Sequence, residues 1–227
     1  MKTIISVIML LLMTSWSYAN DIYVTQSGAS LDLDITQDGE NNTVGNSTTA
    51  STSTGATTIL NIDQIGNSNV ITYQINGATY TGVINLVGSS NNVDLNCDST
   101  GGNSSCGSAN AVINFTGSSN DIDLDIGQTS SASSADVDIV GQTGSDSNVV
   151  AATVDCNSAI LTITINGDTN NYLIDIDGNG DVNGHTLIHS HTGGIADVDI
   201  IQSGTNDNMI TLTTSGDNAD IDISQTD

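Results

Sequence analysis

One pattern runs through residues 20–227: short stretches in which aliphatic and polar residues alternate, each ending in a cluster of Gly, Asn and Ser. Period-two alternation of β-branched residues is typical of half-buried β-strands, and such clusters are typical of turns. The turn glycines recur at even spacing, as at Gly66, Gly77 and Gly88. One strand and its turn cannot bury their own apolar side, so the units must stack. We therefore expect an all-β fold, a β-solenoid of stacked strand-turn-strand repeats with about 22 residues per coil.

Residues 1–19 have the pattern of a secretory signal peptide. Lys2 provides the charged start, an apolar run follows over residues 4–13, and Ser17, Tyr18 and Ala19 precede the expected cleavage site. The apolar run is shorter than the roughly 20 residues that a membrane-spanning helix needs. We therefore predict a protein exported to the cell surface or the extracellular space that does not span a membrane.

Residues 20–227 are expected to form one repeat domain with Ser/Thr/Gly-rich insertions at the coil corners. The expected insertions are Ser47–Thr58, Cys97–Asn110, Thr129–Ala135 and Val182–Gly194. The chain contains no proline, so no ladder hydrogen bond is lost to a missing N–H group.

The charge balance excludes several classes of function. Lys2 is the one basic residue against 26 acidic residues, which gives a formal net charge of −25. Without cations the chain cannot neutralise nucleic-acid phosphates or bind anionic lipid through a basic patch. Enzymes that need an arginine clamp or a catalytic lysine are excluded as well. We expect no enzymatic activity.

Four glutamines share the parity of the aliphatic residues in their strands, so they are expected to point inward at the strand end. A glycine follows each of them two positions later. A buried amide needs a partner, and the glutamine of the next coil would supply one, as in the amide ladders of cross-β stacks. The other interpretation is that glutamine merely tolerates a turn. The pairs are Gln26 with Gly28, Gln37 with Gly39, Gln64 with Gly66, and Gln202 with Gly204.

The sequence Gln64-Ile65-Gly66-Asn67-Ser68-Asn69 resembles the curlin repeat of bacterial curli fibre subunits. Looser copies begin at Gln26, Gln37, Gln142 and Gln202. The last three include an asparagine further on: Gln37 with Asn42, Gln142-Thr143-Gly144 with Asn148, and Gln202 with Asn208. The resemblance implies a secreted subunit whose coils stack into an amyloid-type extracellular fibre for biofilm matrix and adhesion. It also implies that these Gln, Gly and Asn residues lock one coil onto the next.

Six pairs of aspartates are spaced two residues apart. On a strand the members of a pair share one face, about 6.6 Å from each other. A pair that recurs six times is a feature of the repeat, so we interpret it as a solvated strand face rather than a catalytic carboxylate pair. Aspartates on neighbouring coils would repel by around 0.9 kcal/mol in water, and salt or calcium would relieve this repulsion. The pairs are Asp32/Asp34, Asp123/Asp125, Asp136/Asp138, Asp175/Asp177, Asp197/Asp199 and Asp220/Asp222.

One segment has the ligand spacing of a calcium loop. Asp175, Asp177, Asn179 and Asp181 occupy positions 1, 3, 5 and 7 of an EF-hand-like pattern, with Gly180 at position 6. The glutamate expected at position 12 is absent, and an ordinary Asp/Asn/Gly turn explains the same residues. We therefore expect no required cofactor, with calcium at this loop as the alternative.

The histidines and cysteines offer further candidates. His185, His189 and His191 have a spacing that suits zinc or copper with a nearby carboxylate, and a polar insertion is the alternative. A disulfide between Cys97 and Cys106 would close the insertion between them. Cys156 is then left over, either buried or available for pairing between molecules.

Together these patterns favour a secreted structural protein, a curli-like subunit that polymerises into fibres or coats the cell surface. The alternative is a monomeric solenoid adhesin or calcium-dependent binding module, with surface glycans or divalent cations as ligands. Ice binding through Thr-x-Thr ranks such as Thr162/Thr164 and Thr211/Thr213 is a further alternative.

Overall fold

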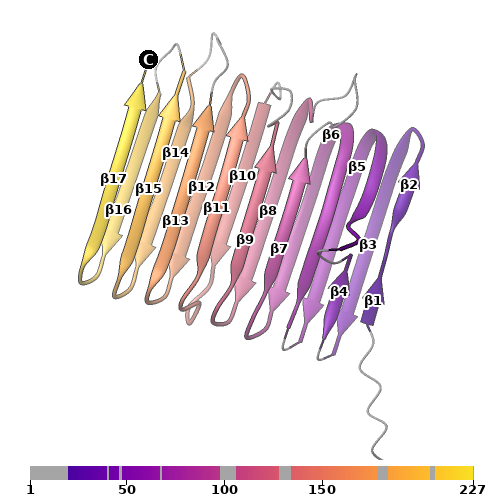
Figure 1. Cartoon of the computed structure of the whole chain (residues 1–227), viewed down its shortest axis with the longest axis horizontal. Coiled ribbons are helices and arrows are strands. Elements are labelled where there is room, and N and C mark those ends of the chain that lie inside the picture. Colours follow the sequence, from indigo (N-terminus) through magenta and orange to yellow (C-terminus); the bar gives the residue numbers. More distant parts are fainter. Residues whose placement is uncertain are drawn as a thin grey trace, which may run out of the picture.

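The computed structural model describes residues 20–39, 41–45, 48–66, 68–97, 106–127, 134–177, 184–204 and 208–226. Among these residues every regular element is a β-strand, and parallel strands stack with a repeat of about 26 residues (Figure 1). The chain is a β-solenoid, which confirms the fold class expected from the alternation of aliphatic and polar residues.

The strands form two opposed sheets, which we call sheet A and sheet B. Sheet A contains β1 (Asn20–Ile22), β2 (Thr25–Ser27), β4 (Asn42–Val44), β7 (Asn92–Cys97), β9 (Asp121–Ile126), β11 (Val149–Asp155), β13 (Asn170–Asp177), β15 (Ala196–Ser203), β17 (Ala219–Thr226) and the first parts of β5 (Ser51–Ile65) and β6 (Val70–Val87). Sheet B contains β3 (Ser30–Asp38), the second parts of β5 and β6, β8 (Ser108–Thr116), β10 (Ser134–Gly141), β12 (Ala159–Asn166), β14 (Thr186–Thr192) and β16 (Met209–Ser215).

Strands inside the stack bury every second side chain between the two sheets, as the alternation requires, whereas the terminal strand β17 keeps its side chains exposed. Because neighbouring strands are parallel and in register, equivalent residues form columns along the solenoid axis. One column of sheet B holds isoleucine in six successive coils. Its members are Ile35, Ile62, Ile84, Ile113, Ile139 and Ile163. Five of the six are fully buried, and Ile35, in the first coil, keeps 7% of its surface exposed.

The coil length expected from the glycine spacing is too short, because the stacked strands follow one another at about 26 residues. The coils also differ in length. Thr57 pairs with Thr79, and Thr79 pairs with Ser108, so the second of these coils contains more residues than the first. The corners absorb the difference, and the strands stay in register while the turns vary in length.

Two of the expected insertions are wrong in part, because they contain strands of the core. Residues 51–58 belong to β5, and residues 186–192 form β14. The short polar residues Ser and Thr hid these strands from a composition-based argument. The other two expected insertions overlap strand ends, residues 108–110 of β8 and residues 134–135 of β10, and their residues 98–105 and 129–133 lie outside the described residues.

Neither end of the described solenoid is covered by another element. At the C-terminal end, the inward-facing Ile221 and Ile223 of β17 remain 38% and 48% exposed. At the N-terminal end, Leu31 and Leu33 of β3 are only partly buried. Stacked coils normally need polar terminal caps for solubility, so these two ends are the unusual surfaces of the molecule.

Candidate functional site: internal amide ladders and outer carboxylates

The most extensive polar feature of the interior is a ladder of asparagines at the corner where β4, β6, β7, β9, β11 and β13 of sheet A begin. Each Nδ2 atom donates to the Oδ1 atom of the asparagine in the next coil, at 2.6–3.2 Å. All six side chains are at most 3% exposed. The members are Asn42, Asn69, Asn91, Asn120, Asn148 and Asn170.

An amide can form such a ladder because it carries both a donor and an acceptor. The second hydrogen of each Nδ2 group is also used. Asn42 donates to the carbonyl oxygen of Ile65, and Asn120 donates to that of Gly117. The ladder ends where Asn170 Nδ2 lies 3.4 Å from Nδ1 of His191. The column therefore satisfies its own polar groups through six coils.

Three of these residues, Asn42, Asn69 and Asn148, belong to the predicted motif copies, whereas Asn91, Asn120 and Asn170 were not predicted. The available signal was an asparagine one residue before several sheet A strands, as at Asn91 and Asn120. Turns are rich in asparagine for local reasons, so this signal was hidden among other turn residues.

The glutamines form two short ladders. Gln64 Nε2 donates to Gln37 Oε1 at 2.6 Å, and both side chains are buried. Gln225 Nε2 lies 3.4 Å from Gln202 Oε1, so Gln202 pairs with a residue outside the predicted ladder. The first ladder stops after Gln64 because Leu86 takes its place in the next coil.

Two of the expected ladder glutamines lie elsewhere. Gln26 is half-buried, has no glutamine beside it because its register partner is Ser53, and donates to the carbonyl oxygen of Ser30 at 3.2 Å. Gln142 is exposed, so its expected place in the ladder is wrong. Gly141 occupies the inward position there, because a Cβ atom at residue 141 would lie 2.8 Å from the ring of Phe115.

Two of the motif glycines show why glycine is needed. A Cβ atom on Gly66 would lie 2.0 Å from the carbonyl oxygen of Gly39 in the coil below. Gly144 has a φ of 87°, a conformation that other residues rarely adopt. Gly28, Gly39 and Gly204 lie at the ends of β2, β3 and β15, as the motif places them.

The calcium-loop residues are only partly within the described structure. Asp175 and Asp177 lie on the outer side of β13, and Asn179 and Asp181 lie outside the described residues. Burial and the neighbouring Asp177 carboxylate raise the pKa of Asp175. The described residues contain no group of three or more His, Cys, Asp or Glu side chains placed to hold a metal ion. The calcium site stays a prediction.

The three histidines are buried inside the solenoid, so the interpretation of a polar insertion is wrong. His185, His189 and His191 are at most 2% exposed. His189 and His191 do not converge on a shared point with His185, whose Nδ1 accepts a hydrogen bond from the backbone N–H of Ala159. Within the described part of the chain, the zinc or copper arrangement suggested by their spacing is therefore not formed.

His189 occupies the position that six preceding coils give to isoleucine, next to Ile163 on one side and Leu212 on the other. Its ring packs edge-on against Tyr172, with 4.3 Å between centroids, and neither ring nitrogen has a hydrogen-bond partner among the described residues. Burial, and secondarily the nearby His191, lower the pKa of His189 to about 4. The Tyr172 hydroxyl lies 3.0 Å from His191 Nδ1, and burial lowers the pKa of His191.

The expected disulfide between Cys97 and Cys106 is present, with 5.5 Å between the Cα atoms. It closes the corner between β7 and β8. Cys156 is a buried thiol outside this bond.

The outer surface is acidic, and its aspartates follow the register. Asp197 pairs with Asp220, and Asp199 with Asp222, on β15 and β17. Burial is the main cause of a raised pKa at Asp123, and the carboxylates of Asp94 and Asp121 add to it. On sheet B some aspartates lie beside an amide instead, as where Asn61 Nδ2 donates to Asp34 Oδ1 at 2.8 Å.

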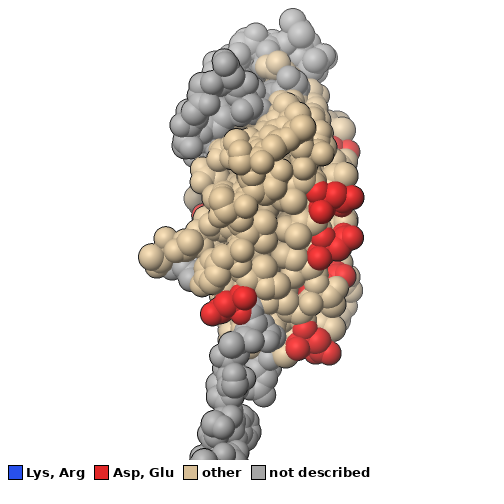
Figure 2. Space-filling model, turned by 90° about the vertical axis from the view of Figure 1, so that its right-hand side faces the viewer, with Lys and Arg blue, Asp and Glu red and all other residues tan. Residues whose placement is uncertain are grey.

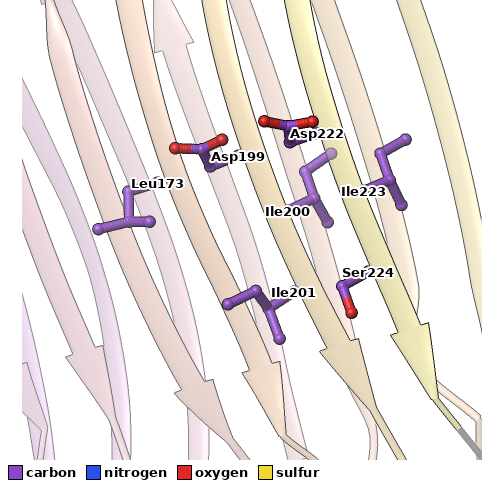
Figure 3. Close-up of a pocket in the computed structure, with 7 residues that line it drawn as sticks. All are labelled: Leu173, Asp199, Ile200, Ile201, Asp222, Ile223 and Ser224. Carbon is purple, nitrogen blue, oxygen red and sulfur yellow. The ribbon is translucent and has the colours of Figure 1, made fainter.

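The outer surface also has a shallow hollow near the C-terminal end of sheet A (Figure 3). Asp199 and Asp222 lie side by side there, in line with Leu173. Ile201 and Ser224 occupy the next positions along the same strands. The hollow is open to solvent and offers two carboxylates and an apolar floor.

Comparison with known proteins finds no family model, curated protein or solved structure that matches this chain. The similarity to the curlin repeat therefore stays a prediction. Among the described residues no helix is long and apolar enough to cross a membrane.

The asparagine ladder gives a first prediction. Replacing Asn120 by alanine removes the acceptor of the Asn91 side chain and leaves Asn148 Oδ1 with only the backbone N–H of residue 120, so it should lower the free energy of unfolding by about 3 kcal/mol. Asn171→Ala, an exposed change on β13, is the control and should alter it by less than about 0.5 kcal/mol. Urea unfolding measures both. Equal effects of the two changes would contradict a stabilising ladder.

The second prediction concerns acid sensitivity. The pKa of His189 in the folded chain, about 4, is below the ordinary value of 6.5, so folding favours the neutral ring. Its contribution is therefore complete above pH 6.5 and is lost as the pH falls from 6.5 towards 4, by about 3 kcal/mol. His189→Ile should remove this part of the pH dependence, measured by urea unfolding at about pH 8 and about pH 4.5. The same loss of stability in both proteins would show that His189 is not its source.

The third prediction concerns the carboxylates. Raising the ionic strength from about 0.01 M to about 1 M shortens the screening length from about 30 Å to about 3 Å and should raise the melting temperature. If the aspartate columns bind calcium, calcium should raise the melting temperature at a lower concentration than the salt does. Thermal melts followed by circular dichroism test both effects, and melts unchanged by either addition would refute the repulsion.

Proposed function

We propose that this chain is a secreted structural subunit, curli-like in organisation, that assembles end to end into extracellular fibres. The observation that carries the proposal is the open C-terminal end. There Ile221 and Ile223 point into the core layer but keep 38% and 48% of their surface exposed. The backbone edges of β16 and β17 are uncovered as well, and an uncovered edge is a template for another strand.

The N-terminal end supports the proposal with a matching surface. Ile22, Val24, Leu31 and Leu33 are partly buried and lie at the edge of the core. Figure 2 looks onto this end of the solenoid, where acidic side chains stand at the outer sides and uncharged atoms cover the middle. Two ends of this kind can approach each other in spite of the net charge of −25.

The ladders support a role in assembly because they run along the solenoid axis. The backbone groups repeat in every coil, and the pair of Gln202 and Gln225 reaches the last strand, so addition of a coil from a second copy repeats interactions already present within one copy. This is the basis of cross-β stacking.

The second candidate is a monomeric surface-binding module. The feature that favours it is the hollow with Asp199 and Asp222, which offers oxygen ligands to a divalent cation or a glycan. Ice binding has less support, because Thr162 and Thr211 are not neighbours: Ile188 lies between them on the intervening strand β14.

The fourth prediction tests fibre formation. The chain beginning at Asn20, incubated with and without calcium, should form filaments in electron micrographs, with a repeat of about 4.7–4.8 Å in fibre diffraction. Ile223→Asp should abolish filaments, because it places a charge in the end-to-end contact. Ile201→Asp is the control, since Ile201 is 47% exposed on the outer side of β15 and should leave filaments unchanged.

Circular dichroism of the Ile223→Asp protein should show the β-fold retained, because residue 223 lies in the last strand. A wild-type chain that stays monomeric under every condition would overturn the proposal and favour the binding module.

A further inference from the structure

The two sheets contain unequal numbers of strand positions. The described part of sheet A has nine, because it begins with β1–β2 and ends with β17, whereas that of sheet B has eight, from β3 to β16. The described solenoid therefore ends with a half coil. If a second copy were stacked without rotation, β1–β2 would cover β17, and an empty position one strand wide would separate β16 from β3 of the added copy.

A half-turn about the solenoid axis removes this gap. The rotation exchanges the two sheets, so that sheet B of the added copy continues sheet A of the first. It also reverses the strand direction, and since the strands of the two sheets run in opposite directions, the new neighbours are parallel (Figure 1). β3 then covers β17, and β1–β2 cover β16.

The sequences of the strands that meet in this arrangement correspond closely. Residues 219–225 read Ala-Asp-Ile-Asp-Ile-Ser-Gln, and residues 31–37 read Leu-Asp-Leu-Asp-Ile-Thr-Gln. The inward side chains would stack in three pairs of matching character beside the smaller Ala219. The pairs are Ile221 on Leu33, Ile223 on Ile35 and Gln225 on Gln37.

The glutamines also agree in the direction of their hydrogen bonds. Within the molecule the later glutamine donates to the earlier one, from Gln64 to Gln37 at 2.6 Å and from Gln225 to Gln202 at 3.4 Å. With the half-turn, Gln37 of the added copy would donate to Gln225 Oε1. Two ladders of two glutamines would then become one ladder of four across the junction.

The other half of the junction is also apolar. On β16 the partly buried Ile210 and Leu212 would meet Ile22 and Val24, which are partly buried at the opposite end. On the outside, Asp220 and Asp222 would lie beside Asp32 and Asp34. Inside the molecule Asp220 and Asp222 already lie beside Asp197 and Asp199 in the same way.

We propose that successive copies in the fibre are related by a half-turn about its axis, with β17 of one copy paired in parallel with β3 of the next. The proposal rests on the end-to-end assembly put forward above, and it specifies the partner strands and the symmetry.

The fifth prediction uses pairs of cysteines to distinguish the two ways of stacking. Ser224 would face Thr36 of the next copy with the half-turn, and Thr25 without it. Adjacent strands lie about 4.8 Å apart, within the Cα separation that a disulfide spans. Filaments of Ser224→Cys/Thr36→Cys should therefore give covalent oligomers of many copies on non-reducing gels, and Ser224→Cys/Thr25→Cys should not. The single Ser224→Cys chain controls for chance pairing, including pairing through Cys156.

The outcomes separate the two proposals. Filaments that cross-link through the Thr25 pair, or through neither pair, overturn the half-turn and leave fibre formation standing. A wild-type chain that forms no filaments overturns both. Electron microscopy of the wild-type filament provides a test without mutations, since a half-turn requires a twofold screw axis along the fibre.

Discussion

The structure depends on one constraint, namely that parallel strands stack in register at a fixed spacing. This constraint places every inward side chain directly against the equivalent side chain of the next coil. In the isoleucine column the stacked side chains are stabilised by dispersion and burial. In the asparagine column each side chain donates a hydrogen bond to the asparagine of the next coil. A polar residue that cannot pair along its column is costly, because no water reaches it there.

The same constraint explains what could be predicted from the sequence. Alternation of aliphatic and polar residues sets which side chains point inward, so the β-solenoid and the inward glutamines Gln37 and Gln64 followed from parity alone. The coil length did not follow, because corners of different length leave the strand register unchanged. Gln142 was misplaced because it was assigned from the motif and not from parity: the inward positions of its strand are Val137, Ile139 and Gly141, so Gln142 lies on the outer side.

The candidate site was harder to predict than the fold. Each ladder asparagine has an ordinary turn sequence around it, and only the stacking of distant coils reveals that the residues are neighbours. The histidines were misread for the opposite reason. Their polarity indicated a surface, yet in β14 they fall on the inward positions, where His189 continues a column of isoleucines. Both cases show a side chain whose environment is determined by other coils rather than by its own neighbours in sequence.

The asparagine ladder also has a direction. In each ladder bond the amide hydrogen points towards the C-terminal coils, so the dipoles add along the axis and each bond polarises the next. Such a series must end on an atom that accepts, and it ends on Nδ1 of His191, which faces both Asn170 and the Tyr172 hydroxyl. Asn170 Nδ2 can only donate, so the ladder favours the tautomer in which Nδ1 of His191 accepts and the hydrogen is on Nε2. The direction of a series that begins at Asn42 thus bears on the protonation of a histidine ring at the other end of the column.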